Sequence, residues 1–146
     1  MKDGNDECFR IHNYGGPEVL AYEEAPCPKV GENDVLIRVS AASVNPYDWK
    51  VRQGCVKRWI DYSLPLILGW DVSGVIESVG SGVINFDIGD EVFASAIQDT
   101  EVLSEIAALI DSGRVKPVVS TVLPLNEVKQ AHALSESMHT RGKVIF

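Results

Sequence analysis

The sequence predicts a mainly β domain, a small barrel or sandwich with a few helices at its periphery. Two observations lead to this prediction. Up to Ala94 the chain consists of short β-branched and apolar runs separated by Gly-, Pro- and Asn-rich turns, which is typical of small barrels and sandwiches. After residue 98 the apolar spacing becomes helical, and helices alternate with strands to the end of the chain.

The first part of the chain is expected to contain short strands and one short helix. Alternating apolar side chains mark residues 35–44 as a strand. Asn45 opens a turn, and the short helix that follows is stopped by Gly54. A hairpin turn is expected at residues 80–82. The remaining strands of this part are expected at residues 8–11, 19–23, 72–79 and 91–94.

The second part is expected to contain two helices and two strands. An amphipathic helix starts near Thr100 and stops at Gly113, where a left-handed residue suits a helix C-terminus. One face of this helix carries aliphatic side chains at helical spacing: Val102, Ile106, Leu109 and Ile110. The other elements are a strand at residues 115–123, a helix from Pro124 and a terminal strand at residues 142–146.

Charge and composition exclude several classes of protein. The chain has 146 residues, a formal net charge of -8 and scattered basic residues, so we expect no nucleic-acid partner. The cysteines Cys8, Cys27 and Cys55 form no C-x-x-C pair and are expected to be free thiols in a reducing compartment. No apolar run approaches the length of a membrane span. We therefore expect a cytoplasmic protein with no membrane partner.

Several phrases follow one another in a characteristic order. They are IHNYGGPEVL at residues 11–20, SVNPYDWK at 43–50, PLILGWDVSGV at 65–75 and GDEVF at 89–93. Together with the tail, they resemble the zinc-free, quinone-oxidoreductase-like branch of the medium-chain dehydrogenase/reductase superfamily. The resemblance covers about residues 9–146. It implies a GroES-like β-barrel and, for the full-length family, NADPH-dependent reduction of a quinone or an enone.

The chain departs from the family pattern at the nucleotide-binding domain. Family members continue after the strand at residues 92–93 with a glycine-rich strand and a Rossmann domain, whereas this chain runs into a helix that resembles the last one of that domain. No strand here is followed by G-x-G-x-x-G and a helix, so we expect no cofactor-binding residues. The resemblance divides the chain into a first GroES-like part, a residual Rossmann helix and a returning GroES-like part: residues 1–98, 99–114 and 115–146.

Positions that bind zinc in other branches of the superfamily hold different residues here. Where those branches have a cysteine, this chain has the run Asn45-Pro46-Tyr47-Asp48, and where they have a His-Glu pair after a glycine, it has Trp70-Asp71. A catalytic zinc needs about three protein ligands, usually Cys, His or carboxylates. We therefore expect no metal site.

The resemblance places the cleft of the family at the loop and helix that follow residue 44. Asn45, Tyr47 and Asp48 are the candidate catalytic residues. Asn and Tyr side chains can donate hydrogen bonds to a quinone or enone oxygen, and this stabilises the negative charge that develops as hydride arrives. The candidate substrate-binding residues are Trp49, Lys50, Trp70 and Asp71.

These residues also have purely structural interpretations. Asn45 can belong to an ordinary turn, and Asp48 can cap the helix. Asp71 can make a structural hydrogen bond, or it can shape the cleft by pairing with Arg52 or Lys50. The aromatic side chains can pack against a flat ring substrate or only against the core and rim of the barrel: Trp49, Trp59 and Tyr62.

The expected function is that of the substrate-binding domain of an NADPH-dependent quinone or enone oxidoreductase, inactive alone because the nucleotide domain is absent. Two alternatives stay open. One is a binding module for a small aromatic ligand or a protein, and the other is an enzyme completed by a separate nucleotide-domain chain. The helix at residues 101–112 lacks the sheet that it covers in the family, so it is expected to fold back on the barrel or to form a homodimer.

Overall fold

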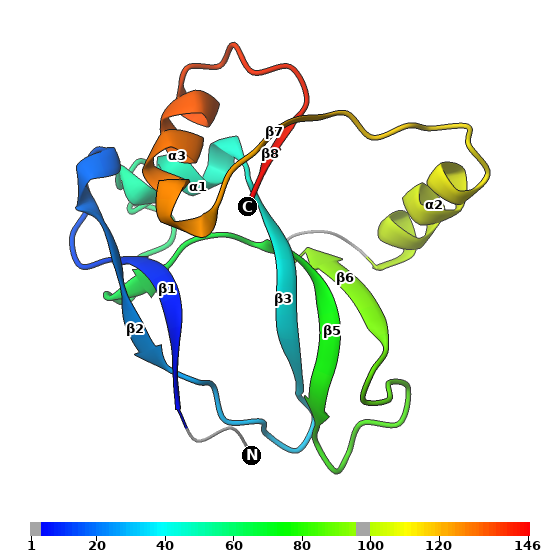
Figure 1. Ribbon diagram of the computed structural model, residues 1–146. Coiled ribbons are helices and arrows are strands. Elements are labelled where there is room, and N and C mark those ends of the chain that lie inside the picture. The colour runs from blue at the N-terminus through cyan, green and yellow to red at the C-terminus, as the bar shows by residue number, and fades with distance from the viewer. Residues whose placement is uncertain (1–3, 96–99) are drawn as a thin grey trace.

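The computed structural model describes residues 4–95 and 100–146, and its strands form two sheets (Figure 1). One sheet has the order β2-β1-β4 and the other the order β6-β5-β3-β8-β7. The pairs are antiparallel except for the parallel pair β7-β8. The strands are β1 (Asn5–Ile11), β2 (Leu20–Pro26), β3 (Val35–Val44), β4 (Leu66–Ile67), β5 (Asp71–Val79), β6 (Glu91–Ser95), β7 (Val119–Val122) and β8 (Lys143–Ile145).

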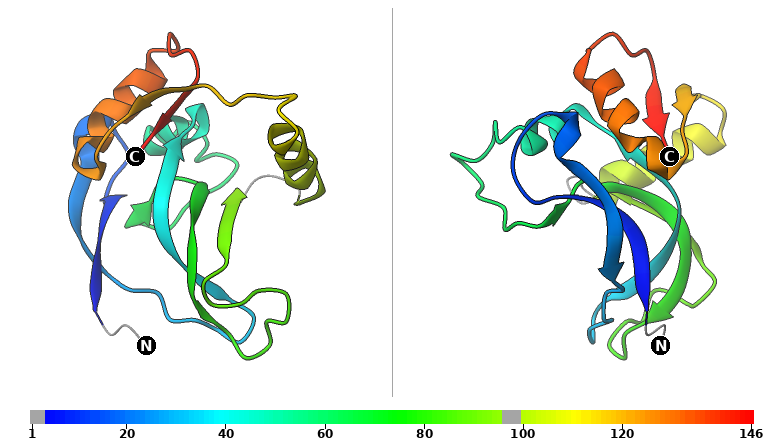
Figure 2. Two further views of the ribbon diagram at one scale, coloured as in Figure 1. Left: turned by 45° about the vertical axis from the view of Figure 1, so that its right-hand side comes forward. Right: turned by 60° about the vertical axis from the view of Figure 1, so that its left-hand side comes forward.

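Three helices lie at the periphery of the sheets. Helices α1 (Pro46–Arg52) and α3 (Val128–Glu136) pack together at one end of the sheets, whereas α2 (Thr100–Asp111) lies apart, beside β6 (Figures 1 and 2). Short 3-10 turns precede β2 and α3, at Pro17–Val19 and Leu125–Glu127. None of the helices in the described ranges is long and apolar enough to cross a membrane. This mainly β architecture with peripheral helices confirms the predicted fold class.

Most elements lie where the sequence placed them, with two instructive differences. Val39, an apolar residue of the strand expected at residues 35–44, is 57% exposed; it pairs with Gly74, next to a register shift between Val39 and Ala41. The strand expected at residues 115–123 is limited to β7, because its partner β8 is itself short. The expected domain boundary at residues 98 and 99 lies outside the described residues.

Helix α3 holds the two sheets together. One buried cluster joins it to β1 and β2: Phe9, Ile11, Leu20 and Val128. A second buried cluster joins it to β3 and β8: Val44, Ala131 and Val144. Fully burying an aliphatic or aromatic side chain of this size contributes roughly 1.5–3 kcal/mol. The folded state therefore depends on the packing of α3 in the returning part of the chain.

An ion pair between the buried Arg52 and the partly exposed Glu136 joins α1 to α3. The Arg52 side chain is completely buried; its Nη2 donates to Oε2 of Glu136 at 2.6 Å, and its Nε donates to the carbonyl of Gly15 at 3.2 Å. Gln53 donates to the other carboxylate oxygen of Glu136. Removing Glu136 would leave the buried Arg52 charge without its carboxylate partner, which destabilises the fold. The role of Arg52 is therefore structural, since its side chain holds α1 against α3.

Two titratable side chains on these helices are also buried, Asp48 and His132. Burial raises the pKa of Asp48 to about 6, and the Asp71 carboxylate adds to this, whereas the Asn45 N–H and the Lys143 ammonium oppose it. Burial, together with the Arg52 charge, lowers the pKa of His132 to about 4. Between these pKa values both side chains are neutral in the folded protein and charged in the unfolded chain.

We expect Asp48 and His132 to change the free energy of unfolding with pH in opposite directions between about pH 4 and 6, so that the two changes cancel in the wild type. A variant that lacks one of the two groups should show the pH dependence of the other. The raised pKa of Asp48 stabilises the fold at low pH, and this stabilisation is lost as the pH rises through 6. The lowered pKa of His132 destabilises the fold as the pH falls from about 6.5 towards 4. Asp48→Asn should therefore leave a free energy of unfolding that rises with pH relative to the wild type, and His132→Gln one that falls.

In each variant, the slope of the free energy of unfolding against pH should differ from that of the wild type by up to about 1.4 kcal/mol per pH unit. Urea denaturation across this pH range measures it, with Asp61→Asn, at an exposed carboxylate, as the control. Curves for the three variants that run parallel to the wild-type curve would show that neither buried group titrates as described.

The apolar face of α2 is only partly covered. The helix ends before Gly113, whose φ of +70° is the left-handed conformation expected there. Leu103 and Ile106 line a cavity beside β6. Val102, Ile106 and Ile110 nevertheless stay 44%, 43% and 36% exposed. The helix thus folds back on the sheet in part and leaves an aliphatic strip in water.

We expect this aliphatic strip to drive self-association of the purified chain, because exposed apolar patches associate. The double variant Ile106→Glu/Ile110→Glu should lower the average mass measured by light scattering. Ile84→Glu, at an isoleucine that is 90% exposed in the loop after β5, is the control and should leave that mass unchanged. A monomeric wild type whose thermal stability is also unchanged in the double variant would refute this expectation.

Candidate functional site

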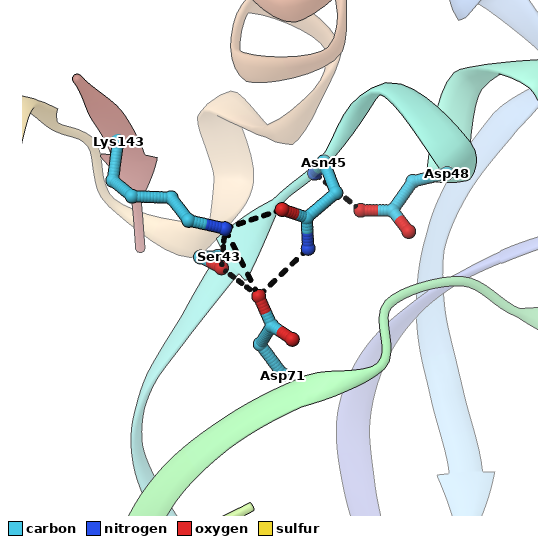
Figure 3. A network of polar contacts seen from close by, with 5 residues as sticks. All are labelled: Ser43, Asn45, Asp48, Asp71 and Lys143. Carbon is cyan, nitrogen blue, oxygen red and sulfur yellow. Dashed lines mark hydrogen bonds and ion pairs between the residues drawn. The ribbon is translucent and has the colours of Figure 1, made fainter. Parts of the chain in front are cut away.

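Asp71, the first residue of β5, is the centre of a polar network (Figure 3). Its Oδ2 accepts hydrogen bonds from Oγ of Ser43 at 2.6 Å and from Nδ2 of Asn45 at 2.7 Å. The same oxygen lies 3.1 Å from Nζ of Lys143. The ammonium of Lys143 also contacts Oδ1 of Asn45 and, at 3.3 Å, Oγ of Ser43. A single carboxylate oxygen therefore gathers three donors.

Strand pairing brings these residues together from distant parts of the sequence. β8 pairs with the end of β3, with Ser43 opposite Ile145, and this places the first residue of β8 beside Asn45. β5 pairs with the other edge of β3, with Ala42 opposite Val72, and this places Asp71 beside Ser43. The network consequently forms only when both pairs of strands are in register.

Hydrogen bonding keeps Asp71 ionised. Partial burial would raise the pKa of its carboxyl group, but hydrogen bonds outweigh burial and lower the pKa to about 2. The donors are Ser43, Asn45, Ser95 and Lys143. At neutral pH the site therefore holds a carboxylate with an ammonium beside it.

The partner of Asp71 differs from those that the sequence suggested. Arg52 and Lys50 were expected as candidates, but the ion pair is made by Lys143. Arg52 is buried against Glu136 instead. Nζ of Lys50 lies 5.5 Å from the centre of the Trp49 ring. The physical reason is that β8 pairs with the other edge of β3, from where the Lys143 side chain reaches past Ser43 to Asp71.

A cavity of about 710 Å³ opens beside the network. Its polar lining comes from the network, Tyr47, Ser73 and Ser95, whereas most of its wall is apolar: Ala41, Val72, Phe93, Leu103, Ile106 and Ile145. A mostly apolar cavity with a few converging polar groups is typical of sites for small molecules. The arrangement can hold a flat apolar compound and direct hydrogen-bond donors at its polar end.

Tyr47 and Trp70 belong to an aromatic cluster at this cavity. The hydroxyl groups of Tyr47 and Tyr62 lie 3.0 Å apart, and this hydrogen bond raises the pKa of Tyr62 to about 12. The rings of Tyr47 and Trp70 pack edge to face with their centroids 4.9 Å apart, and the centroids of the Trp70 and Tyr62 rings lie 6.0 Å apart. Trp70 therefore supports Tyr47 in the cavity wall. Trp59, in contrast, is 67% exposed.

The other candidate residues point elsewhere. The buried carboxylate of Asp48 accepts the backbone N–H of Asn45 at 2.7 Å and so fixes the start of α1. Trp49 and Lys50 line a separate opening of about 510 Å³, which shares Asn45 and Lys143 with the first cavity. The structure thus gathers Asn45, Tyr47, Trp70 and Asp71 at one place and separates Asp48, Trp49 and Lys50 from them.

Three donors to Asp71 were missed by the sequence analysis, Ser43, Ser95 and Lys143. Ser43 had a usable signal, because residues two apart on a strand share a face and Ser43 lies two before Asn45. Lys143 lies 72 positions from Asp71 in the chain, and its place depends on the pairing of β8 with β3. No local pattern carries that information.

Two family models match the chain. The model described as the alcohol dehydrogenase GroES-like domain matches residues 31–114, and the one described as zinc-binding dehydrogenase matches residues 83–146. Fold and cavity together define a domain of mainly β structure with a cavity that is polar at one end. Because the first match covers more than half of the chain, the protein belongs to the alcohol dehydrogenase GroES-like domain family.

Several similar proteins are named oxidoreductases. The chain is 37% identical over 131 residues to the NADPH-dependent alkenal/one oxidoreductase, chloroplastic, of Arabidopsis thaliana, covering 88% of this chain and 34% of that protein. It is 44% identical over 86 residues to the quinone oxidoreductase of Rattus norvegicus, covering 58% and 26%. The quinone oxidoreductase structure from Coxiella burnetii matches with a TM-score of 0.58 and 29% identity, covering 82% of this chain and 48% of that one.

These comparisons confirm the predicted family. The relatives of the chain are quinone oxidoreductases of the medium-chain dehydrogenase/reductase superfamily. The chain spans about a quarter to a third of the length of the two curated relatives named here.

The residues at the cavity do not fit the zinc ion that the name of the second family model implies. The available acceptors are Ser43, Asn45 and Asp71, and the ammonium of Lys143 already contacts all three. Protein zinc sites use Cys, His and carboxylate ligands, with at least three from the protein. Within residues 4–95 and 100–146, no group of three or more His, Cys, Asp or Glu residues is placed to hold a metal.

We expect the purified chain to carry no stoichiometric zinc, because a second cation beside Lys143 would be repelled and would lack ligands. Elemental analysis after purification without a chelator measures the zinc content. Added zinc should also leave the midpoint of thermal unfolding unchanged. About one zinc per chain, removed together with stability by a chelator, would contradict this expectation.

Proposed function

We propose that the chain is the substrate-binding part of an NADPH-dependent quinone or enone reductase, and that alone it binds the carbonyl compound without transferring hydride. The observation that carries this proposal is the Asn45 amide, held by charged partners at the polar end of a mostly apolar cavity. The names of its relatives, which are quinone and alkenal/one oxidoreductases, support the substrate class.

The donors for a carbonyl oxygen are Asn45 and Tyr47, which both line the cavity. Nδ2 of Asn45 carries two N–H groups. One of them donates to Asp71, and the other has no partner among the residues that the structure describes. An oriented N–H donor stabilises the negative charge that develops on a quinone or enone oxygen as hydride adds to the conjugated system. The apolar wall accommodates the planar body of such a compound.

Hydride in the complete enzyme comes from NADPH, whose chemistry belongs to the cofactor. This sequence contains no strand followed by G-x-G-x-x-G and a helix, the arrangement that binds a dinucleotide pyrophosphate. A net charge of -8 also disfavours a polyanion. We therefore propose that these residues supply the substrate half of the cleft and that the cofactor is held by protein outside this sequence.

A non-catalytic binding module is the second candidate. It is favoured by α2, which contributes Leu103 and Ile106 to the cavity wall and so gives the chain an apolar pocket of its own. Such a module would select ligands by shape and apolar surface. It would then bind a hydrocarbon as well as the corresponding enone.

We expect 2-cyclohexen-1-one to bind saturably, and cyclohexene, which lacks the carbonyl group, to bind at least about fivefold more weakly. Asn45→Ala should weaken enone binding roughly five- to tenfold, as expected for one lost hydrogen bond, and leave hydrocarbon binding unchanged. Asn126→Ala, at an exposed asparagine, is the control. Chemical-shift titration of the isotope-labelled chain measures these affinities. Equal binding of both compounds would favour the non-catalytic module.

Calorimetric titration with NADPH should show no saturable binding, and NADPH absorbance should stay constant when the enone is added. Micromolar binding of NADPH, or its oxidation by the purified chain, would overturn the proposed inactivity.

A further inference from the structure

We propose that Lys143 is a positioning residue, which sets the orientation of the Asn45 amide and acts on the bound carbonyl compound through it. The proposal rests on the function proposed for this cavity and adds a residue to it. Lys143 lies 98 positions after Asn45 in the sequence, and it is not one of the candidate residues that the sequence predicted. Its contacts explain why the amide presents an N–H to the cavity rather than an oxygen.

The charges around Asn45 select one of the two orientations of its amide. Oδ1 can only accept hydrogen bonds and Nδ2 can only donate them. The ammonium of Lys143 lies against Oδ1, and Oδ2 of Asp71 lies 2.7 Å from Nδ2. Rotation of the amide by half a turn would set two donors together and two acceptors together. The pair of charges therefore fixes the amide more firmly than either neutral partner would.

Lys143 has no donor left for a ligand. An ammonium carries three N–H groups. Nζ contacts Oδ1 of Asn45, Oδ2 of Asp71 and Oγ of Ser43. A hydrogen bond from this pair to a ligand must consequently come from the second N–H of Asn45. Because a positive charge beside Oδ1 polarises the amide, it also makes that N–H a stronger donor.

The backbone at Lys143 is fixed, so the ammonium is delivered to a defined place. The Lys143 N–H donates to the carbonyl of Val118 at 2.8 Å, and Val144, the next residue, is buried opposite Val44. Gly142 has a φ of +96°, and a Cβ there would lie 2.5 Å from the Val118 carbonyl oxygen. Glycine is therefore required for the chain to enter β8 at this angle, and Lys143 follows directly.

Lys50 offers a matched control. It lines the neighbouring opening together with Lys143, but its ammonium lies over the Trp49 ring. Removing its charge changes the overall charge by the same amount as removing that of Lys143. A difference between the two variants therefore reports the contacts of Lys143 with Asn45 and not the net charge.

The side-chain amide of Asn45 provides the readout. In the ¹⁵N-labelled chain its resonances are assigned by their loss in Asn45→Ala, and one of the two protons should be shifted by the hydrogen bond to Asp71. Lys143→Met should reduce this separation, because Asp71 alone then orients the amide. It should weaken 2-cyclohexen-1-one binding roughly two- to fivefold, less than Asn45→Ala. Lys143→Arg, which retains a charged donor, should preserve the separation, and Lys50→Met should change neither quantity.

The outcomes separate this proposal from the proposed function. If the wild-type chain does not bind the enone, the proposed function fails, while the amide resonances still decide whether Lys143 orients Asn45. An unchanged separation in Lys143→Met refutes the proposal. A changed separation with unchanged affinity refutes it as well, because Asn45 would then not act on the ligand. Should Lys143→Met fail to fold, Lys143→Gln, which keeps an uncharged donor, is measured in the same way.

Discussion

The site depends on the interactions of one group, the ionised carboxylate of Asp71. Its Oδ2 accepts hydrogen bonds from Ser43 and Asn45 and faces Lys143, and so it ties β5 to the end of β3, the start of α1 and the first residue of β8. A pKa of about 2 keeps this anchor charged at any physiological pH. The oxygen atoms of Ser43, Asn45 and Asp71 surround the ammonium group of Lys143. The site thereby acquires a fixed positive charge without metal ligands.

Strands β3 and β8 contribute residues both to the site and to the buried core, so packing that stabilises the fold also positions the site. Val144 is buried under α3, and Lys143 beside it reaches the opposite side of the sheet. Asp48 lies in the buried layer and fixes the first turn of α1, whose preceding residue is Asn45. A change in the packing of α3 would therefore move both the ammonium and the amide, even though α3 contributes no residue to the cavity wall.

Local features of the fold were predictable from the sequence, and pairing across the fold was not. Turn residues and apolar periodicity located most strands, and contiguous phrases identified Asn45, Tyr47 and Asp71. Trp49 follows Tyr47 by two residues, which is more than half a turn of a helix, so it faces another opening. The place of Lys143 depends on the register of β8 against β3, and the pairing of β3 with β5 contains two register shifts. Such non-local constraints leave no trace in a short window of sequence.

The strands on either side of α2 are the two opposite edges of the five-stranded sheet. β6 ends at Ser95 at one edge, and β7 begins at Val119 at the other, so the pairs β5-β3 and β3-β8 in between do not depend on how long the intervening chain is. Lengthening such a connection costs little, about 0.6 kcal/mol for each doubling. This topology allows the stretch between the two edges to vary in length while the strand pairs that hold the Asp71 network stay in register.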